Sequence, residues 1–205
     1  MTEEMKIDPA TATPAEDYPS LNHLRVMIKK KRKWNSYWDW PDRSVKERGI
    51  AGGILRQSGV QVTRLTSRAP GQDPPDCEAE LDGHFSGVEV TELVDQETLE
   101  QSIRATQQRE AGGDPTKPEV FLLWDRAQLL FELQARIDAK DRSWKGGPYE
   151  RYVLVIHTDE FSLDRETVAR FLQGATFQTH ILTDVFLGLS FGTEPIFRLD
   201  LLPRA

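Results

Sequence analysis

The sequence predicts an α/β protein in which a mixed central sheet is flanked by helices. Segments with apolar residues at helical spacing alternate along the chain with short segments typical of strands. Residues 151–158, RYVLVIHT, form a continuous apolar run of the kind buried on both faces of a sheet. Residues 76–93 alternate as the two arms of a hairpin. Helices interleaved with such strands favour a layered α/β domain.

The composition indicates one folded domain. The chain has 205 residues, of which 38% are hydrophobic, enough for one substantial core. Residues 1–20 are rich in Thr, Pro, Glu and Asp, and we expect a disordered leader there and a single domain over residues 21–205. Cys77 is the single cysteine, so there is no disulfide framework. The sequence has neither a signal segment nor a long apolar run, which predicts a cytoplasmic protein with no membrane partner.

A basic and aromatic arm is expected over residues 21–43. The whole chain carries a net charge of −7, yet residues 25–48 hold nine Lys or Arg residues against three acidic ones, a local charge of +6. Its lysine run could pair with phosphates and its aromatic rings could stack on bases, although the rings could equally pack the arm onto the core. The candidate nucleic-acid-binding residues are Lys29, Lys30, Lys31, Arg32, Lys33 and Trp34.

The first element after the arm is a helix over residues 44–59. Ser44 stands at the expected N-cap with Glu47 three residues later, the spacing of a capping box, and Gly59 should end the helix. A strand over residues 60–65 and a Pro- and Gly-rich loop over residues 68–75 follow.

The elements beyond the hairpin alternate between helices and strands. A surface helix is expected over residues 95–112, and a longer amphipathic helix over residues 122–143 places Leu123, Leu130, Leu133 and Ile137 on one side. The buried strand at 151–158 comes next. The remaining elements are a helix over residues 163–174 and closing strands over residues 184–191 and 195–201.

The hairpin carries six carboxylates in residues 75–93, which strands do not favour. Its arms are expected to meet at residues 82–87. Val88 and Val90 look like core residues, so Glu89 lies on the other face of a strand whose neighbours are buried. A carboxylate there needs a cation or hydrogen-bond donors, and Mg²⁺ held together with Asp76 would serve.

Pro75-Asp76 and Glu89-Val90-Thr91 resemble the signature of the PD-(D/E)XK nuclease superfamily, which has the restriction-endonuclease-like fold. That signature is Pro-Asp at the start of one strand, then an acidic residue, any residue and lysine on the next. The resemblance implies a Mg²⁺- or Mn²⁺-dependent endonuclease in which Asp76 and Glu89 bind the metal. The helix that bears Glu47 corresponds in order to the helix that supplies one more carboxylate in many members, so Glu47 is a candidate third ligand. The order of elements matches from residue 44 to residue 158.

Thr91 stands where the signature has lysine. Its hydroxyl could position a water molecule, but it supplies no positive charge. Lys140 is our choice for the missing amine, because it flanks the apolar stripe of its helix and could reach the hairpin, or it could stay in solvent at the helix end. Lys145 is the second choice, in a segment that reads as a loop.

Two kinds of function are expected from these residues. The first is a metal-dependent nuclease acting on nucleic acid, with DNA favoured over RNA, in which Asp76, Glu89, Thr91 and Lys140 form the catalytic set and the chain could form a homodimer. The second is a non-catalytic member of the same fold that binds nucleic acid or protein. An unrelated α/β interaction protein is a third alternative.

Overall fold

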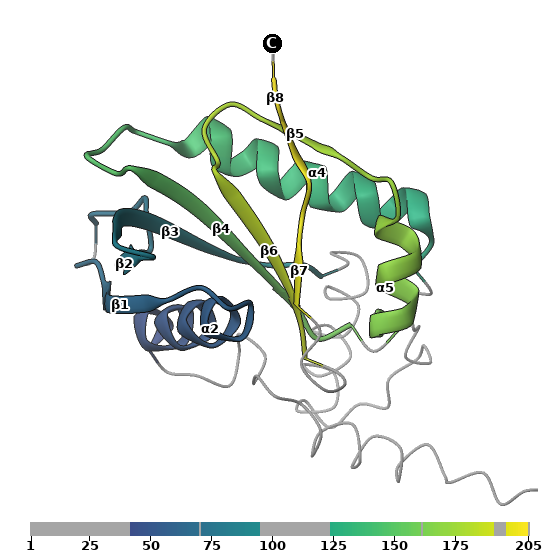
Figure 1. Ribbon diagram of the computed structural model, residues 1–205, viewed down its shortest axis with the longest axis horizontal. Coiled ribbons are helices and arrows are strands. Elements are labelled where there is room, and N and C mark those ends of the chain that lie inside the picture. The colour runs from purple at the N-terminus through teal and green to yellow at the C-terminus, as the bar shows by residue number, and fades with distance from the viewer. Residues whose placement is uncertain (1–41, 70, 95–123, 161, 191–195, 205) are drawn as a thin grey trace, which may run out of the picture. The chain divides into compact units, whose positions relative to one another are not determined.

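The computed structural model describes residues 42–69, 71–94, 124–160, 162–190 and 196–204. The leader, the basic arm up to residue 41 and the helix expected over residues 95–112 lie outside this part of the chain. Figure 1 shows the elements in their spatial arrangement. In chain order they are α2 (Arg43–Gln57), β1 (Val62–Ser67), β2 (Cys77–Leu81), β3 (His84–Glu92), α4 (Arg126–Ser143), β4 (Arg151–Thr158), α5 (Arg165–Leu172), β5 (Phe177–Thr179), β6 (Asp184–Leu189), β7 (Ile196–Arg198) and β8 (Leu201–Pro203).

The core of the fold is a six-stranded mixed sheet with the strand order β1-β2-β3-β4-β6-β7. β3, β4 and β6 run parallel to one another, whereas β1, β2 and β7 join by antiparallel pairing. β5 and β8 form a separate two-stranded parallel sheet. The expected α/β class with a mixed sheet and flanking helices is therefore confirmed.

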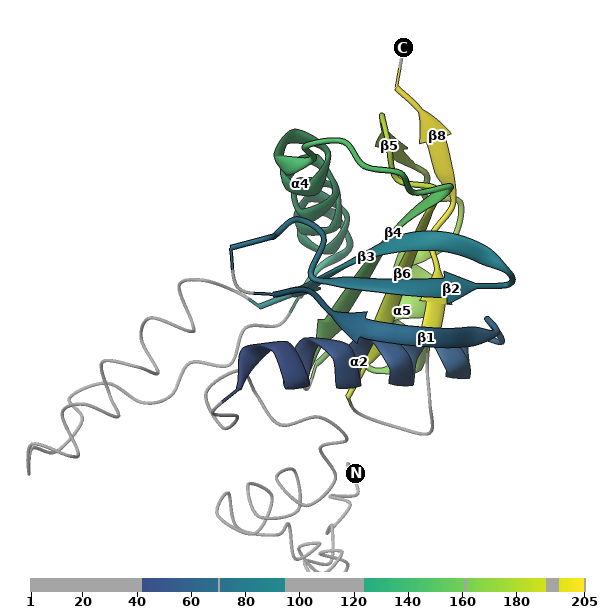
Figure 2. The same ribbon diagram turned by 90° about the vertical axis from the view of Figure 1, so that its left-hand side faces the viewer.

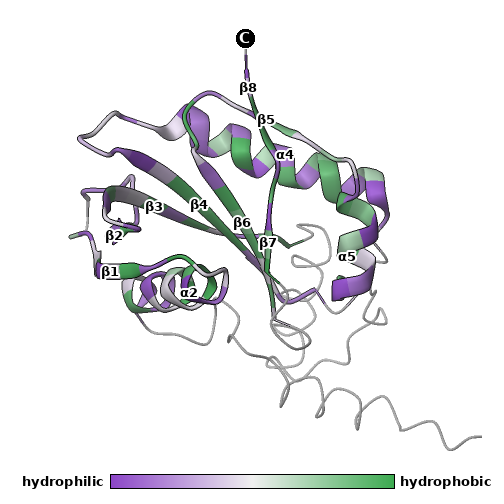
Figure 3. Cartoon of the chain, in the orientation of Figure 1, coloured by the Kyte–Doolittle hydropathy of each residue, from purple (hydrophilic) through white to green (hydrophobic). Residues whose placement is uncertain are grey.

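Helices cover both faces of the central sheet, with α2 on one side and α4 on the other (Figure 2). The alternation of β4 divides the core between them: Val153 and Val155 pack toward α2, and Leu154 and Ile156 pack toward α4 and α5. Because β4 is buried on both faces, it reads as a continuous apolar run, visible as green in the middle of β4 and β6 in Figure 3.

The helix before the sheet begins earlier than expected. Asp42, and not Ser44, is the N-cap, because its carboxylate accepts the backbone N–H groups of Ser44 at 2.9 Å and Val45 at 3.3 Å. Glu47 therefore closes no capping box and instead accepts a hydrogen bond from Arg43. Gly59 lies just beyond the helix with φ 88°, as expected for its end.

The hairpin turn is tighter than the six residues expected. Asp82 and Gly83 make the turn alone, both with positive φ (50° and 86°), and β3 starts at His84. An Asp-Gly pair adopts this conformation readily, and its twist matches that of the two strands. Five residues of β2 therefore pair in continuous register with β3, from Leu81 opposite His84 to Cys77 opposite Val88.

The C-terminal segment forms two strands in place of the one expected over residues 195–201. β7 pairs with β6 of the central sheet, and the chain then turns away at the buried Leu199 so that β8 pairs with β5. β5 itself was not expected, since three residues carry too little periodicity to indicate a strand.

Candidate active site

Asp76 and Glu89 are brought together by the register of the hairpin. Cys77 pairs with Val88, so continuing the pairing by one residue places Asp76 opposite Glu89. β2 begins at Cys77, and the carboxylate of the preceding residue, Asp76, accepts the backbone N–H of Val90 at 2.8 Å. Val88 and Val90 pack in the core that faces α2, which leaves Glu89 on the face that carries α4.

Lys140 of α4 supplies a cation to both carboxylates. Ile137 and Leu133, about one and two turns before Lys140, are fully buried and fix the helix on the sheet. The Nζ of Lys140 donates a hydrogen bond to Oε2 of Glu89 and lies 3.9 Å from Oδ2 of Asp76. The lysine side chain is 20% exposed, against 2% for Glu89 and 4% for Asp76, so Lys140 is the most exposed of these three residues.

Tyr152 of β4 holds the second oxygen of Glu89. Its hydroxyl donates to Oε1 of Glu89 at 2.7 Å, in a fully buried contact. Burial and the charge of Glu89 raise the pKa of Tyr152, so the hydroxyl keeps its proton and acts as a donor. Sequence reasoning missed this residue, although a tyrosine inside an otherwise apolar buried strand is itself a signal, because a buried hydroxyl needs a partner.

Asp76 is buried without full compensation of its charge. Burial raises its pKa to about 7, and the negative charges of Glu89 and Glu47 act in the same direction. The hydrogen bond from Val90 and the charge of Lys140 oppose this shift but do not cancel it. Ionised Asp76 would therefore gain from a further positive charge.

Arg43 links Glu47 to Asp76. Nε of Arg43 donates to Oε1 of Glu47 at 2.6 Å, and Nη2 of Arg43 lies 3.8 Å from Oδ1 of Asp76. Both residues belong to α2, where they occupy positions one turn apart. Arg43 was not among the residues proposed from sequence, because its role depends on how α2 lies beside the hairpin.

The other predicted residues lie at the margin of this cluster or outside the described chain. Thr91 is half-buried on β3, two residues after Glu89 and on the same face, opposite Ile156 of β4. Lys145 donates from Nζ to the backbone oxygen of Asp73 at 3.3 Å, in the loop that leads to Asp76. Lys29, Lys30, Lys31, Arg32, Lys33 and Trp34 fall in the part of the chain that is not described.

The donor set fits a hard divalent ion only in part. Among the residues described, no three His, Cys, Asp or Glu side chains are grouped so as to hold a metal ion. Asp76 and Glu89 alone would offer two carboxylates, and an ion bound there would complete its shell with water and substrate oxygen, as Mg²⁺ commonly does. Such an ion would share these oxygens with Lys140, which now bonds Glu89.

A comparison of the chain with protein-family models, curated proteins and solved structures finds no match. None of the helices in the described residues is long and apolar enough to cross a membrane.

Proposed function

We propose that this protein hydrolyses phosphodiester bonds of nucleic acid with the help of Mg²⁺ or Mn²⁺. One observation carries the proposal: Asp76 and Glu89, from neighbouring arms of a hairpin, share the amine of Lys140 from a helix beyond it. Two carboxylates and a lysine are the groups that the PD-(D/E)XK signature provides. Here the lysine comes from α4, and Thr91 stands at the signature position.

Each residue of the cluster has a distinct role in this proposal. Asp76 and Glu89 would hold the metal, and the chemistry it would supply there is activation of water and compensation of charge on the scissile phosphate. Lys140 stabilises the charge that develops on the phosphoryl oxygens. Tyr152 orients Glu89 through its 2.7 Å hydrogen bond. Glu47 can be a further ligand only if its hydrogen bond from Arg43 breaks.

The arrangement of the elements supports a restriction-endonuclease-like fold as part of the proposal. A helix (α2) precedes three antiparallel strands (β1 to β3), and after α4 the chain returns as β4, parallel to β3. This is the element order that the resemblance implies, with Asp76 directly before the start of β2 and Glu89 within β3.

A second function, binding of nucleic acid without cleavage, is favoured by one specific observation. Both carboxylate oxygens of Glu89 already have protein donors, Tyr152 and Lys140, so its charge is matched within the chain. In this alternative the Lys140–Glu89 pair is structural, and Thr91 marks the loss of the catalytic lysine.

The test is cleavage of labelled single-stranded and duplex DNA and RNA by the full chain in Mg²⁺, Mn²⁺ or EDTA. Asp76→Asn and Glu89→Gln should each lower metal-dependent cleavage by on the order of a hundredfold or more, because each removes a charged ligand. Calorimetric titration with Mn²⁺ alone gives a second readout, in which both variants should bind the ion more weakly.

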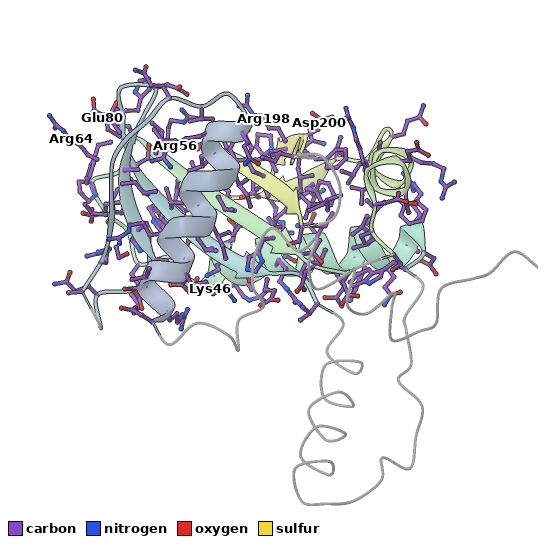
Figure 4. All side chains as sticks on the ribbon, turned by 90° about the horizontal axis from the view of Figure 1, so that it is seen from below. Lys46, Arg56, Arg64, Glu80, Arg198 and Asp200 are labelled. Carbon is purple, nitrogen blue, oxygen red and sulfur yellow. The ribbon has the colours of Figure 1, made fainter. Side chains whose placement is uncertain are left out.

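Glu80→Gln is the matched control, since Glu80 is a partly exposed carboxylate on the same hairpin, bonded to Arg64 at its edge (Figure 4). It should cleave and bind Mn²⁺ like the unaltered protein. Cleavage by neither the unaltered chain nor the control, on any of these nucleic acids, would favour the binding-only function.

A further inference from the structure

Four aromatic rings form a continuous row beside the candidate active site. Phe85 and Tyr149 have ring centroids 5.2 Å apart, Tyr149 and Tyr152 6.1 Å, and Tyr152 and Trp144 6.0 Å. We call Phe85, Tyr149, Tyr152 and Trp144 the aromatic row. These separations lie within the range of contacting aromatic pairs.

The aromatic row is joined to the carboxylate cluster by direct contacts. Tyr152 donates its hydroxyl to Glu89 at 2.7 Å, and Tyr149 donates to Glu78 of the same hairpin at 2.8 Å. Trp144 is the C-cap of α4, four residues after Lys140. The row therefore meets the carboxylate cluster at Tyr152, and Trp144 follows Lys140 by about one helical turn.

Glycines let the backbone approach two of the rings closely. A Cβ at Gly87 would lie 2.8 Å from the Tyr152 ring, and a Cβ at Gly147 would lie 2.5 Å from the Tyr149 ring. The two tyrosines therefore lie against backbone and are held in place by their hydrogen bonds. The middle of the row is therefore fixed in place.

The two ends of the aromatic row are open to solvent. Phe85 is 39% exposed and Trp144 is 40% exposed, whereas Tyr152 between them is 4% exposed. Arg68 donates to the hydroxyl of Tyr149 at 3.3 Å, and Lys145 follows Trp144 directly in the chain. Partly exposed aromatic rings with cations nearby are the combination that binds bases and their phosphates.

We propose that the aromatic row stacks an unpaired nucleobase next to the scissile phosphate, so that the substrate is single-stranded nucleic acid. This rests on the proposed nuclease function. In a duplex, the faces of each base are covered by its neighbours, so only an unpaired base offers a face to Trp144 or Phe85. Stacking also provides affinity that does not depend on charge, which matters in a chain whose net charge is −7.

Binding of fluorescein-labelled oligonucleotides to the full chain tests this without any cleavage step. Fluorescence anisotropy in EDTA would compare a 20-nucleotide strand, the duplex of the same sequence and an abasic strand of equal length. The single strand should bind at least about tenfold more tightly than either of the others, the scale of stacking one base. Equal affinity for all three, or no binding, would overturn the proposal.

Variants of Trp144 test whether its ring stacks the base. Trp144→Ala should weaken binding of the single strand by about tenfold, and Trp144→Tyr should restore most of it, because a ring face is what stacking requires. Phe131→Ala is the matched control: Phe131 is 70% exposed on the same helix, and nine residues before Lys140 places it on the opposite side. Equal losses in Trp144→Ala and Phe131→Ala would overturn the proposal.

The failure of this inference can be told apart from failure of the nuclease function. Glu89→Gln should lower cleavage by on the order of a hundredfold or more while the single strand still binds more tightly than the duplex. If the unaltered chain binds single strands through Trp144 but cleaves none, the stacking site stands and the nuclease function falls. If it cleaves duplex and single strand alike, and Trp144→Ala cleaves both normally, the nuclease function stands and the stacking site falls.

Discussion

Two buried aspartates in this protein have opposite pKa shifts. Asp76 is 6% exposed and Asp184 is 3% exposed, so both carboxylates have lost their hydration. Burial raises the pKa of Asp76 to about 7. Burial also disfavours ionised Asp184, but hydrogen bonds and charges from Arg151, Thr183 and Arg198 outweigh it, and the pKa of Asp184 lies below its ordinary value.

The two pKa values shift in opposite directions because the two carboxylates have different hydrogen-bond and ion-pair partners. Oδ2 of Asp184 accepts from Arg151 at 2.8 and 3.2 Å and from Thr183 at 3.0 Å, while Arg198 donates to Oδ1. Asp76 accepts one backbone N–H, and its nearest cations, Lys140 and Arg43, stand 3.9 and 3.8 Å away.

The two clusters also lie in different parts of the fold. Figure 4 shows Arg198, a partner of Asp184, at the far end of α2 from Lys46, which lies one turn after Arg43. The charge of Asp184 is balanced by Arg151 and Arg198, so this cluster stabilises the fold. The cluster around Asp76 keeps a deficit of positive charge, which is typical of a site that receives a ligand.

The largest effect on stability is expected at the cluster around Asp184. Asp184→Ala leaves Arg151 and Arg198 without their shared acceptor, and it should lower the free energy of unfolding by about 3 kcal/mol. Urea unfolding at pH 7 measures this. Asp138→Asn is the control, because Asp138 pairs with Arg204 at 2.7 Å near the surface, and its loss should stay within about 1 kcal/mol. Equal losses of unfolding free energy in Asp184→Ala and Asp138→Asn would mean that burial does not make the ion pairs of Asp184 stronger than the pair of Asp138.

The next effect is on activity at the Asp76 cluster. Lys140→Ala should leave a folded chain by circular dichroism and lower Mg²⁺-dependent cleavage by on the order of a hundredfold or more, because one charge-stabilising group is lost. Lys145→Ala is the matched variant, since Lys145 contacts the backbone of Asp73 and not the carboxylates. Activity lost in Lys145→Ala and kept in Lys140→Ala would move the catalytic role to Lys145.

A smaller effect, of opposite sign to that at Asp184, is expected from Asp76→Asn. The amide oxygen can still accept the N–H of Val90, and the buried charge disappears. We expect the free energy of unfolding at pH 8 to rise by about 1–2 kcal/mol, part of the shift that burial produces. A loss of stability in urea unfolding would show that ionised Asp76 is compensated after all.

The smallest effect is the change with pH in the stability that Asp76→Asn gains. Unfolded Asp76 loses its proton near its ordinary pKa of 3.8, whereas the native group keeps it to about pH 7, so the native state becomes less stable as pH rises between the two values. The gain in Asp76→Asn should be near zero at pH 4 and level off above pH 7. Asp184 should behave oppositely, because its contribution is present above pH 3.8 and is lost in acid. Parallel pH profiles for Asp76→Asn and Asp184→Asn would contradict the comparison.

The sequence by itself determined the features that depend on local periodicity. The alternation of residues 76–93 indicated which face Glu89 occupies, and the apolar stripe of residues 122–143 indicated that α4 lies on the sheet with Lys140 beside it. Both follow because residue spacing alone sets the side of a strand or helix that each residue faces. The run at residues 151–158 likewise indicated a strand buried on both sides.

Only the tertiary structure decided which groups meet across the fold. The pairing of Glu89 with Tyr152, the bridge from Arg43 to Asp76 and the cluster at Asp184 join residues from separate elements. Asp42 caps α2 in place of the expected Ser44, because its carboxylate accepts the first backbone N–H groups of the helix. Such contacts depend on how helices and strands pack against one another, which residue spacing within a single element does not encode.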